Sequence, residues 1–237
     1  MHRFFVDAAP AERAVLSGER ARQIAAVLRL RPGEHIVLVA DRVEHEVELQ
    51  AVAPAQVSGK IVARRPVTTE LSFRLTLAVP VLKGDRSEEV IEAGSQLGVS
   101  RFVPFTSSRS VVPELSASKR ERWRKIAREA AETAHRGEIP RIDPLVTWDA
   151  LLATLGSGAV VCWEEATDPH LLDVVAHGNR SGDVGLVVGP EGGLTAEEIA
   201  VARGHGAAIA SLGRRVLRAE TAAIAAVAML VGARERP

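Results

Sequence analysis

The sequence predicts an α/β protein in which a small β-rich domain precedes a larger domain built on a mostly parallel sheet. Residues 1–70 hold several short strand-like runs and a single helical stretch, which together predict a small β-barrel. From residue 73 to residue 237 strand-like and helical segments alternate, as they do in parallel α/β domains. The pattern changes at Pro66–Glu70, so we expect the linker between the two domains there.

Apolar periodicity predicts the individual elements. Glu44–Val52 carries a glutamate at alternate positions in its first half, so one face of this strand is expected to be solvated. Capping-box pairs, Thr195 with Glu198 and Ser118 with Glu121, predict where two helices begin. The other strands are expected at residues 3–6, 35–40, 56–65, 73–82, 98–105, 159–163, 184–188 and 207–212, and the helices at 17–30, 87–97, 118–135, 148–155, 169–175, from 195 and from about 219.

Composition excludes several classes of protein. Thirty basic side chains balance thirty acidic ones, so no overall charge favours nucleic acid or a membrane surface. The single cysteine, Cys162, rules out a disulfide within the chain and is expected to be a buried thiol. No histidine pairs with a cysteine or carboxylate at metal-ligand spacing. The longest apolar stretch, Ala222–Ala233, is shorter than the roughly 20 residues that span a bilayer, and MHRFFVD lacks the apolar core of a signal peptide. We therefore expect a cytoplasmic protein without a metal or a membrane segment.

The stretch Leu186–Ala223 carries the strongest signal for a binding site. One apolar run ends in Gly189-Pro190-Glu191-Gly192-Gly193, and a second ends in the basic loop Gly213–Arg218. Two strand-to-loop junctions so close together indicate a site at the carboxyl ends of neighbouring parallel strands. The first loop lacks the G-x-G-x-x-G order, so a standard dinucleotide fingerprint is not expected. Taken alone, this loop is also typical of a tight turn between a strand and a helix.

The residues of these two loops suggest a chemistry. Glycines let the backbone approach a flat ligand closely, and main-chain N–H and C=O groups can read a purine edge. Glu220 and Thr221 stand where the last helix should begin, so a capping role is equally open for them. Arg218 precedes that helix in an otherwise apolar neighbourhood and is harder to explain by packing.

Basic residues are concentrated in two segments of the second part. Residues 107–141 hold nine lysines or arginines against five acids, and residues 199–219 hold four arginines and no acid. If these segments face one side they form a local phosphate-binding surface, whereas as separate helix faces they are unremarkable. The same two interpretations, solvated face or RNA contact, apply to a group of arginines near the first helix: Arg20, Arg22, Arg29 and Arg31.

Short motifs spread over the chain resemble one family. The pieces are Arg3-Phe4-Phe5, Val27–Gly33, Lys83-Gly84-Asp85-Arg86, Leu97-Gly98-Val99, Pro104-Phe105, Ser108-Arg109-Ser110, Arg136 with Pro140, Val188–Gly193, Leu212-Gly213 and Leu217–Ala222. Their order and spacing resemble the RsmE family, part of the SPOUT superfamily of knotted methyltransferases. That family transfers a methyl group from S-adenosylmethionine to N3 of a uridine in small-subunit (16S) ribosomal RNA.

The resemblance implies an architecture and a set of partners. It implies a C-terminal parallel sheet with a trefoil knot over residues 73–237 and a PUA-like RNA-binding barrel over residues 1–70. It also implies S-adenosylmethionine as cofactor, the 16S rRNA or the small ribosomal subunit as partner, and a homodimer. True knots are very rare, so no pattern in the sequence would suggest one.

The resemblance, read together with the chemistry, assigns roles to residues. Arg218, Glu220 and Arg109 are the predicted catalytic residues, with Arg218 first because a guanidinium stabilises negative charge on uracil oxygens. The predicted cofactor-binding residues are Val188, Gly189, Pro190, Glu191, Gly192, Gly193, Leu212, Gly213, Leu217, Thr221 and Ala222. The predicted RNA-binding residues are Arg3, Arg20, Arg22, Arg29, Arg31 and Arg136.

Some positions depart from the family pattern. Ala93 and Gln96 stand where a lysine and a glutamate are usual, and Thr133–His135 replaces a glutamine followed by small residues. These positions lie outside the cofactor loops and bear on the substrate side. Two alternatives therefore remain: a ribose 2′-O-methyltransferase on the same fold, and a non-catalytic RNA-binding assembly factor.

Overall fold

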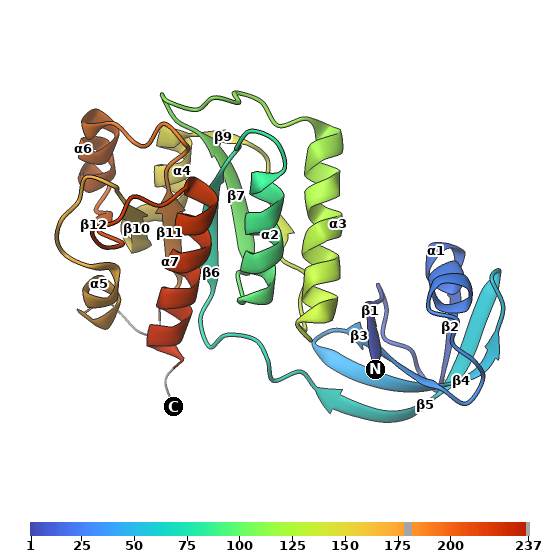
Figure 1. Ribbon diagram of the computed structural model, residues 1–237. Helices are drawn as coiled ribbons and strands as arrows, with labels where there is room; N and C mark the ends of the chain where they lie inside the picture. The colour runs from blue at the N-terminus through green and yellow to red at the C-terminus, as the bar shows by residue number, and fades with distance from the viewer. Residues whose placement is uncertain (178–181, 236–237) are drawn as a thin grey trace. The chain divides into compact units, whose positions relative to one another are not determined.

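The computed structural model describes residues 1–177 and 182–235, and the chain forms two compact units (Figure 1). The first unit comprises Met1–Glu70 and His135–Glu138, and the second comprises Leu71–Ala134 and Ile139–Pro237. The first unit thus includes a short segment that lies far along the chain. No helix in the described residues is long and apolar enough to cross a membrane.

The first unit is built on a five-stranded sheet of order β1-β3-β4-β5-β2. β1 pairs with β3 in parallel, and the other neighbours are antiparallel. In the described part of the chain β1 and β2 stand at the two edges, so the predicted closed barrel stays a prediction. The strands are β1 (His2–Phe5), β2 (Arg13–Ser17), β3 (His35–Ala40), β4 (Val43–Val52) and β5 (Gln56–Pro66).

One helical segment packs on this sheet. It begins as α1 (Gly18–Arg22) and continues as the π-helical turn η1 (Gln23–Val27). It ends before Arg29, which has a positive φ of 54° and so cannot continue the helix. The helix supplies Ala21 and Ile24 to a core that also contains apolar residues of the strands. The helix is therefore held by its buried face rather than by capping side chains.

The second unit contains a seven-stranded parallel sheet. Its order is β12-β10-β11-β6-β7-β8, with β9 also pairing with β7. The strands are β6 (Leu75–Pro80), β7 (Arg101–Thr106), β8 (Arg141–Ile142), β9 (Val146–Thr147), β10 (Ala159–Cys162), β11 (Val184–Val188) and β12 (Ala208–Ala210). The prediction of an α/β domain with a parallel sheet is confirmed.

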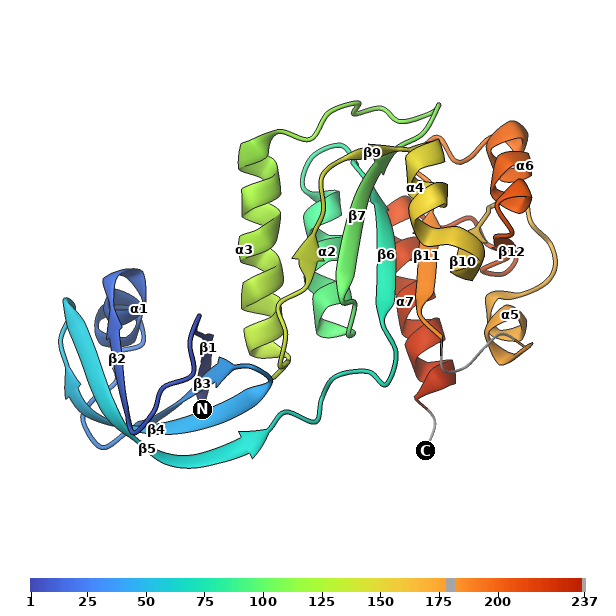
Figure 2. The same cartoon turned by 180° about the vertical axis from the view of Figure 1, so that it is seen from behind.

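Helices cover both faces of this sheet (Figures 1 and 2). Four of them share one core with alternate residues of the strands, and two share the core on the opposite face. The buried runs on the strands therefore carry apolar side chains on both faces, as parallel sheets require. The first group is α2 (Arg86–Gln96), α3 (Ala117–Thr133), α5 (Leu171–His177) and α7 (Ala219–Arg234), and the second is α4 (Trp148–Leu155), which the 3₁₀ turn η2 (Gly156–Gly158) follows, and α6 (Ala196–Gly204).

Two predicted helix starts have different outcomes. Thr195 and Glu198 form the full capping box at the beginning of α6, as predicted. The pair proposed for α3, Ser118 with Glu121, is wrong by two residues. Ser116 is the N-cap there, and its hydroxyl accepts a hydrogen bond from the backbone N–H of Lys119 at 3.2 Å. Ser116 takes this position because its extended backbone leaves the N–H of the third helical residue in reach.

Candidate active site

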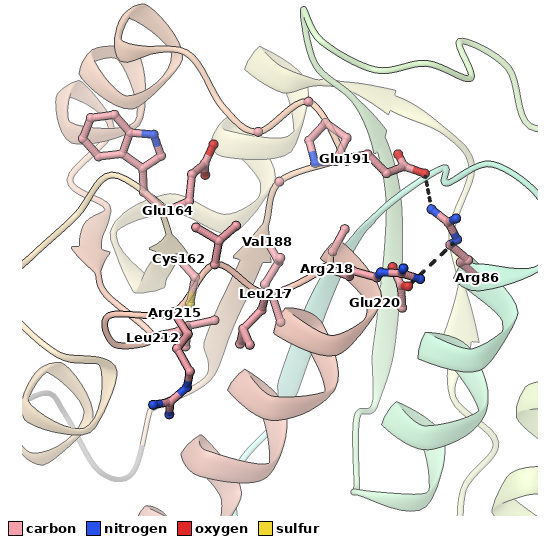
Figure 3. Close-up of a pocket in the computed structure, with 18 of the residues that line it drawn as sticks. Arg86, Cys162, Glu164, Val188, Glu191, Leu212, Arg215, Leu217, Arg218 and Glu220 are labelled. Atoms are coloured by element: carbon pink, nitrogen blue, oxygen red, sulfur yellow. Dashed lines mark hydrogen bonds and ion pairs between the residues drawn. The ribbon is translucent and has the colours of Figure 1, made fainter.

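A pocket of about 580 Å³ opens at the carboxyl ends of the parallel strands in the second unit (Figure 3). Its walls come from the segments that follow β10, β11 and β12, together with the first residues of α2 and α7. β10 lies between β11 and β12, so the two loops that the sequence places together are separated by one strand. Such a position, at the ends of parallel strands, is where α/β domains bind small ligands.

The pocket has an apolar side, near which Glu164 and Arg215 also lie, and a charged side (Figure 3). Cys162, Leu212 and Leu217 lie toward one side, and Arg86, Glu191 and Glu220 gather on the other. A ligand with a flat apolar group at one end and polar groups at the other therefore fits this cavity. Burial raises the pKa of the Cys162 thiol to about 12, so this group is a neutral apolar contact and not a nucleophile.

The glycine loop, residues 189–193, lies close to Arg109 and Glu164. A Cβ at Gly192 would lie 2.9 Å from Cβ and 3.0 Å from the carbonyl oxygen of Arg109. A Cβ at Gly193 would overlap the carboxylate of Glu164, and Gly193 also has a positive φ of 73°. Close packing therefore requires glycine at position 192. At position 193 the positive φ requires it, because the end of the exposed Glu164 side chain can move aside.

Arg86 connects the glycine loop to the last helix. Its Nη1 lies 3.5 Å from Oε1 of Glu191, and its Nε lies 3.9 Å from Oε1 of Glu220. The backbone N–H of Lys83 also donates to Oε1 of Glu191 at 3.1 Å. In the segment between β6 and α2, the carbonyl oxygen of Gly84 accepts a hydrogen bond from Lys119 of α3 at 3.0 Å. The segment after β6 is thus fixed against both walls of the pocket.

Arg218 and Glu220 stand at the beginning of α7. Arg218 is the N-cap residue with an extended backbone, and its exposed side chain makes no capping hydrogen bond. Glu220 lies in the first turn, where the helix dipole favours a negative charge. It is only 8% exposed, and its Oε2 has no hydrogen-bond partner within the described residues. The site therefore holds a cation and a buried acceptor whose hydrogen-bonding capacity is unused.

A comparison with protein families decides what kind of domain holds this pocket. The family model described as an RNA methyltransferase domain matches residues 69–231, which include every residue that lines the pocket. The chain belongs to this family. The curated ribosomal RNA small subunit methyltransferase E of Bacillus subtilis is 33% identical over 225 residues, 91% of this chain and 88% of that protein. The chain thus belongs, within the RNA methyltransferases, to the small subunit methyltransferase E group that the motifs resemble.

Solved structures agree with this assignment. A methyltransferase of Legionella pneumophila in complex with S-adenosylmethionine superposes with a TM-score of 0.87 at 31% identity, covering 98% of this chain and 97% of that one. The ribosomal RNA small subunit methyltransferase E of Neisseria gonorrhoeae, bound to S-adenosylmethionine, gives a TM-score of 0.85 at 25% identity, covering 96% and 95%. The similarity extends over both units of this RNA methyltransferase.

Most of the predicted catalytic and cofactor-binding residues of this RNA methyltransferase lie together. Two do not line the pocket: Thr221 is exposed on α7, and Arg109 lies beside the glycine loop, where its Nη1 donates to the carbonyl oxygen of Gly192 at 3.1 Å. Arg109 therefore contacts the loop backbone instead of the cavity. The predicted residues that do line the pocket are Val188, Gly189, Pro190, Glu191, Gly192, Gly193, Leu212, Gly213, Leu217, Arg218, Glu220 and Ala222.

The sequence-based prediction missed one wall and part of another. Trp163 and Glu164 follow β10, and Arg86 begins α2, yet none of them was expected at the site. Arg86 lies in a motif that the family resemblance had marked, which was the available signal. Nothing local marks the segment after β10, because only the position of that strand between β11 and β12 brings it to the pocket. The lining residues that were not expected are Arg86, Cys162, Trp163, Glu164, Arg215, Val216 and Ala219.

Two predicted RNA contacts lie in the interior of the first unit. Arg3 is 7% exposed, and its Nη1 lies 2.7 Å from Oε1 of Glu44. Arg136 is 2% exposed, and its Nη2 lies 2.7 Å from Oε2 of Glu70. The prediction that these two arginines bind RNA phosphates is therefore corrected: both charges are already matched by carboxylates and shielded from a phosphate.

The Glu70–Arg136 pair joins the segment His135–Glu138 to the rest of the first unit. Oε1 of Glu70 also accepts hydrogen bonds from the backbone N–H groups of Gly137 at 2.8 Å and Glu138 at 3.2 Å. Burial alone would raise the pKa of Glu70, but Arg136 and these N–H groups outweigh it and hold the pKa below its usual value. Glu70, expected in a free linker, is instead a fixed structural residue.

The other four predicted RNA contacts lie on or near the surface of the first unit. Arg22, Arg29 and Arg31 are exposed. Arg20 is half-buried: its guanidinium stacks on Phe4 at 5.3 Å from the ring centroid and donates to Oε1 of Gln23 at 3.0 Å. The exposed three are accessible to a phosphate backbone. Within residues 1–177 and 182–235, no group of histidine, cysteine or carboxylate side chains could hold a metal ion.

Proposed function

We propose that this protein methylates N3 of a uridine in the 16S rRNA of the small ribosomal subunit, with S-adenosylmethionine as the methyl donor. The observation that carries the proposal is the pocket itself, in which a glycine loop, an apolar side and Arg218 meet at the ends of parallel strands. The relatives named as small subunit rRNA methyltransferases, and the S-adenosylmethionine held by two solved neighbours, support it.

The residues present fit this cofactor. The cavity volume lies in the range of small-molecule sites, roughly 300–1,000 Å³. Cys162, Leu212 and Leu217 form an apolar side suited to an adenine ring, and the backbone of residues 189–193 offers N–H and C=O groups for its edge. Glu164, exposed in the pocket wall, is suited to receive hydrogen bonds from ribose hydroxyls. S-adenosylmethionine, when bound, supplies a methyl group on a positively charged sulfur.

Arg218 provides the electrostatic part of the reaction in this proposal. A uridine loses its N3 proton reluctantly near neutral pH, so negative charge on the uracil oxygens must be stabilised as the proton leaves. The guanidinium of Arg218 carries a permanent positive charge, and it forms no ion pair within residues 1–177 and 182–235. Because it is not neutralised by a carboxylate, its charge is available to the uracil. Alignment of N3 with the methyl group supplies the remaining part of the rate acceleration.

The first unit and a second copy of the chain complete the proposal. We assign RNA binding to the first unit as a PUA-like domain, through Arg22, Arg29 and Arg31 on its surface. The target base must leave its stack or pair to enter the pocket of the second unit.

We further propose that the cofactor loops form a trefoil knot and that the enzyme acts as a homodimer. Sedimentation equilibrium of the purified chain tests the dimer directly.

Mass spectrometry of rRNA nucleosides tests the function. Small subunits from a strain lacking the gene are incubated with the purified protein and S-adenosylmethionine, and their RNA is digested to nucleosides. We expect 3-methyluridine to appear only with active protein. A ribose-methylated nucleoside instead would establish the 2′-O alternative. Binding of the subunit with no methylated product, together with no calorimetric signal for S-adenosylmethionine, would establish a non-catalytic binding factor.

A further inference from the structure

The charged side of the pocket offers three hydrogen-bonding side chains to which the proposed cofactor contacts assign no role. Arg86, Glu220 and Arg218 all line it (Figure 3). Nε of Arg86 stands 3.9 Å from Oε1 of Glu220, which is longer than a hydrogen bond. Oε2 of Glu220 is shielded and has no partner in the described parts of the chain. A buried carboxylate in this state lacks the hydrogen bonds that ordinarily offset its desolvation.

We propose that Arg86, Glu220 and Arg218 read the pairing edge of the target base as donor, acceptor and donor, and that Glu220 takes the N3 proton. This inference rests on the proposed function and names the groups that perform it. Uracil presents an acceptor, a donor and an acceptor along this edge: O2, N3–H and O4. Two guanidinium groups and a carboxylate form the complementary set. Enzymes that act on an extruded base read it by this edge.

The same three side chains discriminate against cytosine. Cytosine presents O2 and an unprotonated N3 as acceptors and its amino group as a donor. Its N3 lone pair would face the carboxylate of Glu220, and its amino group would face a guanidinium. Each of these contacts pairs like with like, so a buried polar group is left without a partner. The site therefore selects the base whose N3 carries a removable proton.

The proton and electron movements balance without another reagent. Glu220 accepts the proton from N3, and the two electrons of the N–H bond remain on the uracil. Arg86 and Arg218 stabilise the resulting charge on O2 and O4. The N3 lone pair forms the bond to the methyl carbon, the bond from that carbon to sulfur breaks, and its electron pair stays on sulfur. The products are 3-methyluridine, protonated Glu220 and neutral S-adenosylhomocysteine.

Glu220→Gln tests the proton acceptor, because it keeps the shape of the side chain and removes the base. Glu197→Gln is the matched control, since Glu197 occupies the first turn of α6 as Glu220 occupies the first turn of α7, but is exposed and away from the pocket. Calorimetry with S-adenosylmethionine verifies that each variant folds and binds cofactor. In single-turnover assays we expect Glu220→Gln to lose about 10²–10⁴-fold in rate, Glu197→Gln to keep the wild-type rate, and Glu220→Asp to recover part of the loss.

A modified substrate separates proton removal from a structural role. Small subunits are reconstituted on 16S rRNA transcripts made with uridine or with 5-fluorouridine, whose N3–H is more acidic. If Glu220 removes the proton, the deficit of Glu220→Gln shrinks on the more acidic substrate, by at most about tenfold for each unit of added acidity. An equal deficit on both substrates, or an undiminished rate of Glu220→Gln, overturns the inference alone. A wild-type protein that leaves N3 of uridine unmethylated overturns the proposed function together with the inference.

Discussion

Nη1 of Arg109 donates to the carbonyl oxygen of Gly192 at 3.1 Å, and the main chain of Arg109 lies against the Cα of that glycine. The segment after β7 therefore supports the glycine loop from outside the pocket. Because a Cβ at position 192 would meet backbone and not the end of a flexible side chain, the loop or its support must move to accept any larger residue.

This packing predicts the effect of Gly192→Val on cofactor binding. We expect S-adenosylmethionine to bind about tenfold more weakly or worse, since overpacking costs about 1–3 kcal/mol and displaces the loop backbone. Gly204→Val is the control, because a Cβ there meets nothing within 4 Å and the position lies outside the pocket. Titration calorimetry measures both. Equal affinities for Gly192→Val and the wild type would show that residues 189–193 do not bind the cofactor.

Arg218→Ala separates binding from chemistry. The side chain is exposed and makes no capping bond, so its removal leaves the fold and cofactor affinity unchanged. Loss of a group that stabilises charge only in the transition state lowers the single-turnover rate about 10²–10³-fold. Arg214→Ala, in the same loop but outside the pocket lining, is the matched control and keeps its rate. Full turnover by Arg218→Ala on small subunits would rule out its proposed role.

Two kinds of element are predicted well from the sequence: strands with both faces buried, and helices with one buried face. The strand Val184–Val188 and the helix Trp148–Leu155 have the expected bounds, because apolar runs and a helical period are local signals. β8 and β9 have two residues each and carry no such signal. β2, whose exposed residues include Val15, lies on a sheet edge, and its pairing with β5 depends on residues about forty positions away in the sequence.

The candidate site was predictable only where its residues are close in the sequence. Residues 188–193 and 212–222 are recognisable as loops that follow strands. Arg86 reaches the same pocket because β6 pairs with β11, and Glu164 because β10 enters the sheet between β11 and β12. These neighbours follow from the strand order, which no local pattern encodes. Arg136 shows the converse: its charge suggested RNA, but a partner 66 residues away, Glu70, explains it.

Removing Arg136 should loosen the first unit. Arg136→Ala leaves the half-buried carboxylate of Glu70 without its cation, which costs about 3 kcal/mol for a buried pair. All three tryptophans belong to the second unit, so their fluorescence does not follow this change. Hydrogen exchange of peptides from β1 and residues 135–138 reports it instead. We expect the protection of their backbone amides against exchange to fall about 100-fold. Arg22→Ala, an exposed control, leaves protection as it is. Unaltered protection in Arg136→Ala would mean that the Glu70–Arg136 pair contributes little to the stability of the first unit.

Glu70 makes this contribution dependent on pH. Its pKa in the folded chain lies below the ordinary value of 4.5, so its stabilisation is present above that value and is lost as the pH falls through the folded pKa. Glu70→Gln should therefore reduce exchange protection of residues 135–138 at pH 7 and matter less and less below about pH 4. Exchange is compared after correction for the intrinsic rate at each pH. A difference that stays constant from pH 7 to pH 3 would contradict the ionised state of Glu70.

Exposed arginines of the first unit should contribute to RNA affinity and to its salt dependence. Within residues 1–177 and 182–235 the guanidinium groups of Arg22, Arg29 and Arg31 form no ion pair, so each is free to release a counterion from the RNA on binding. Replacing all three by alanine should weaken binding to the small subunit and lower the slope of log K against log salt by about one unit for each phosphate that is no longer neutralised. Arg3→Ala is an unsuitable control because that residue is buried. Arg74→Ala, at an exposed position of the second unit outside both basic segments, serves instead. Filter binding over a range of salt concentrations measures the slope. A triple variant with the wild-type slope would place the RNA on another face, and the basic residues of α3 would then be the next to replace.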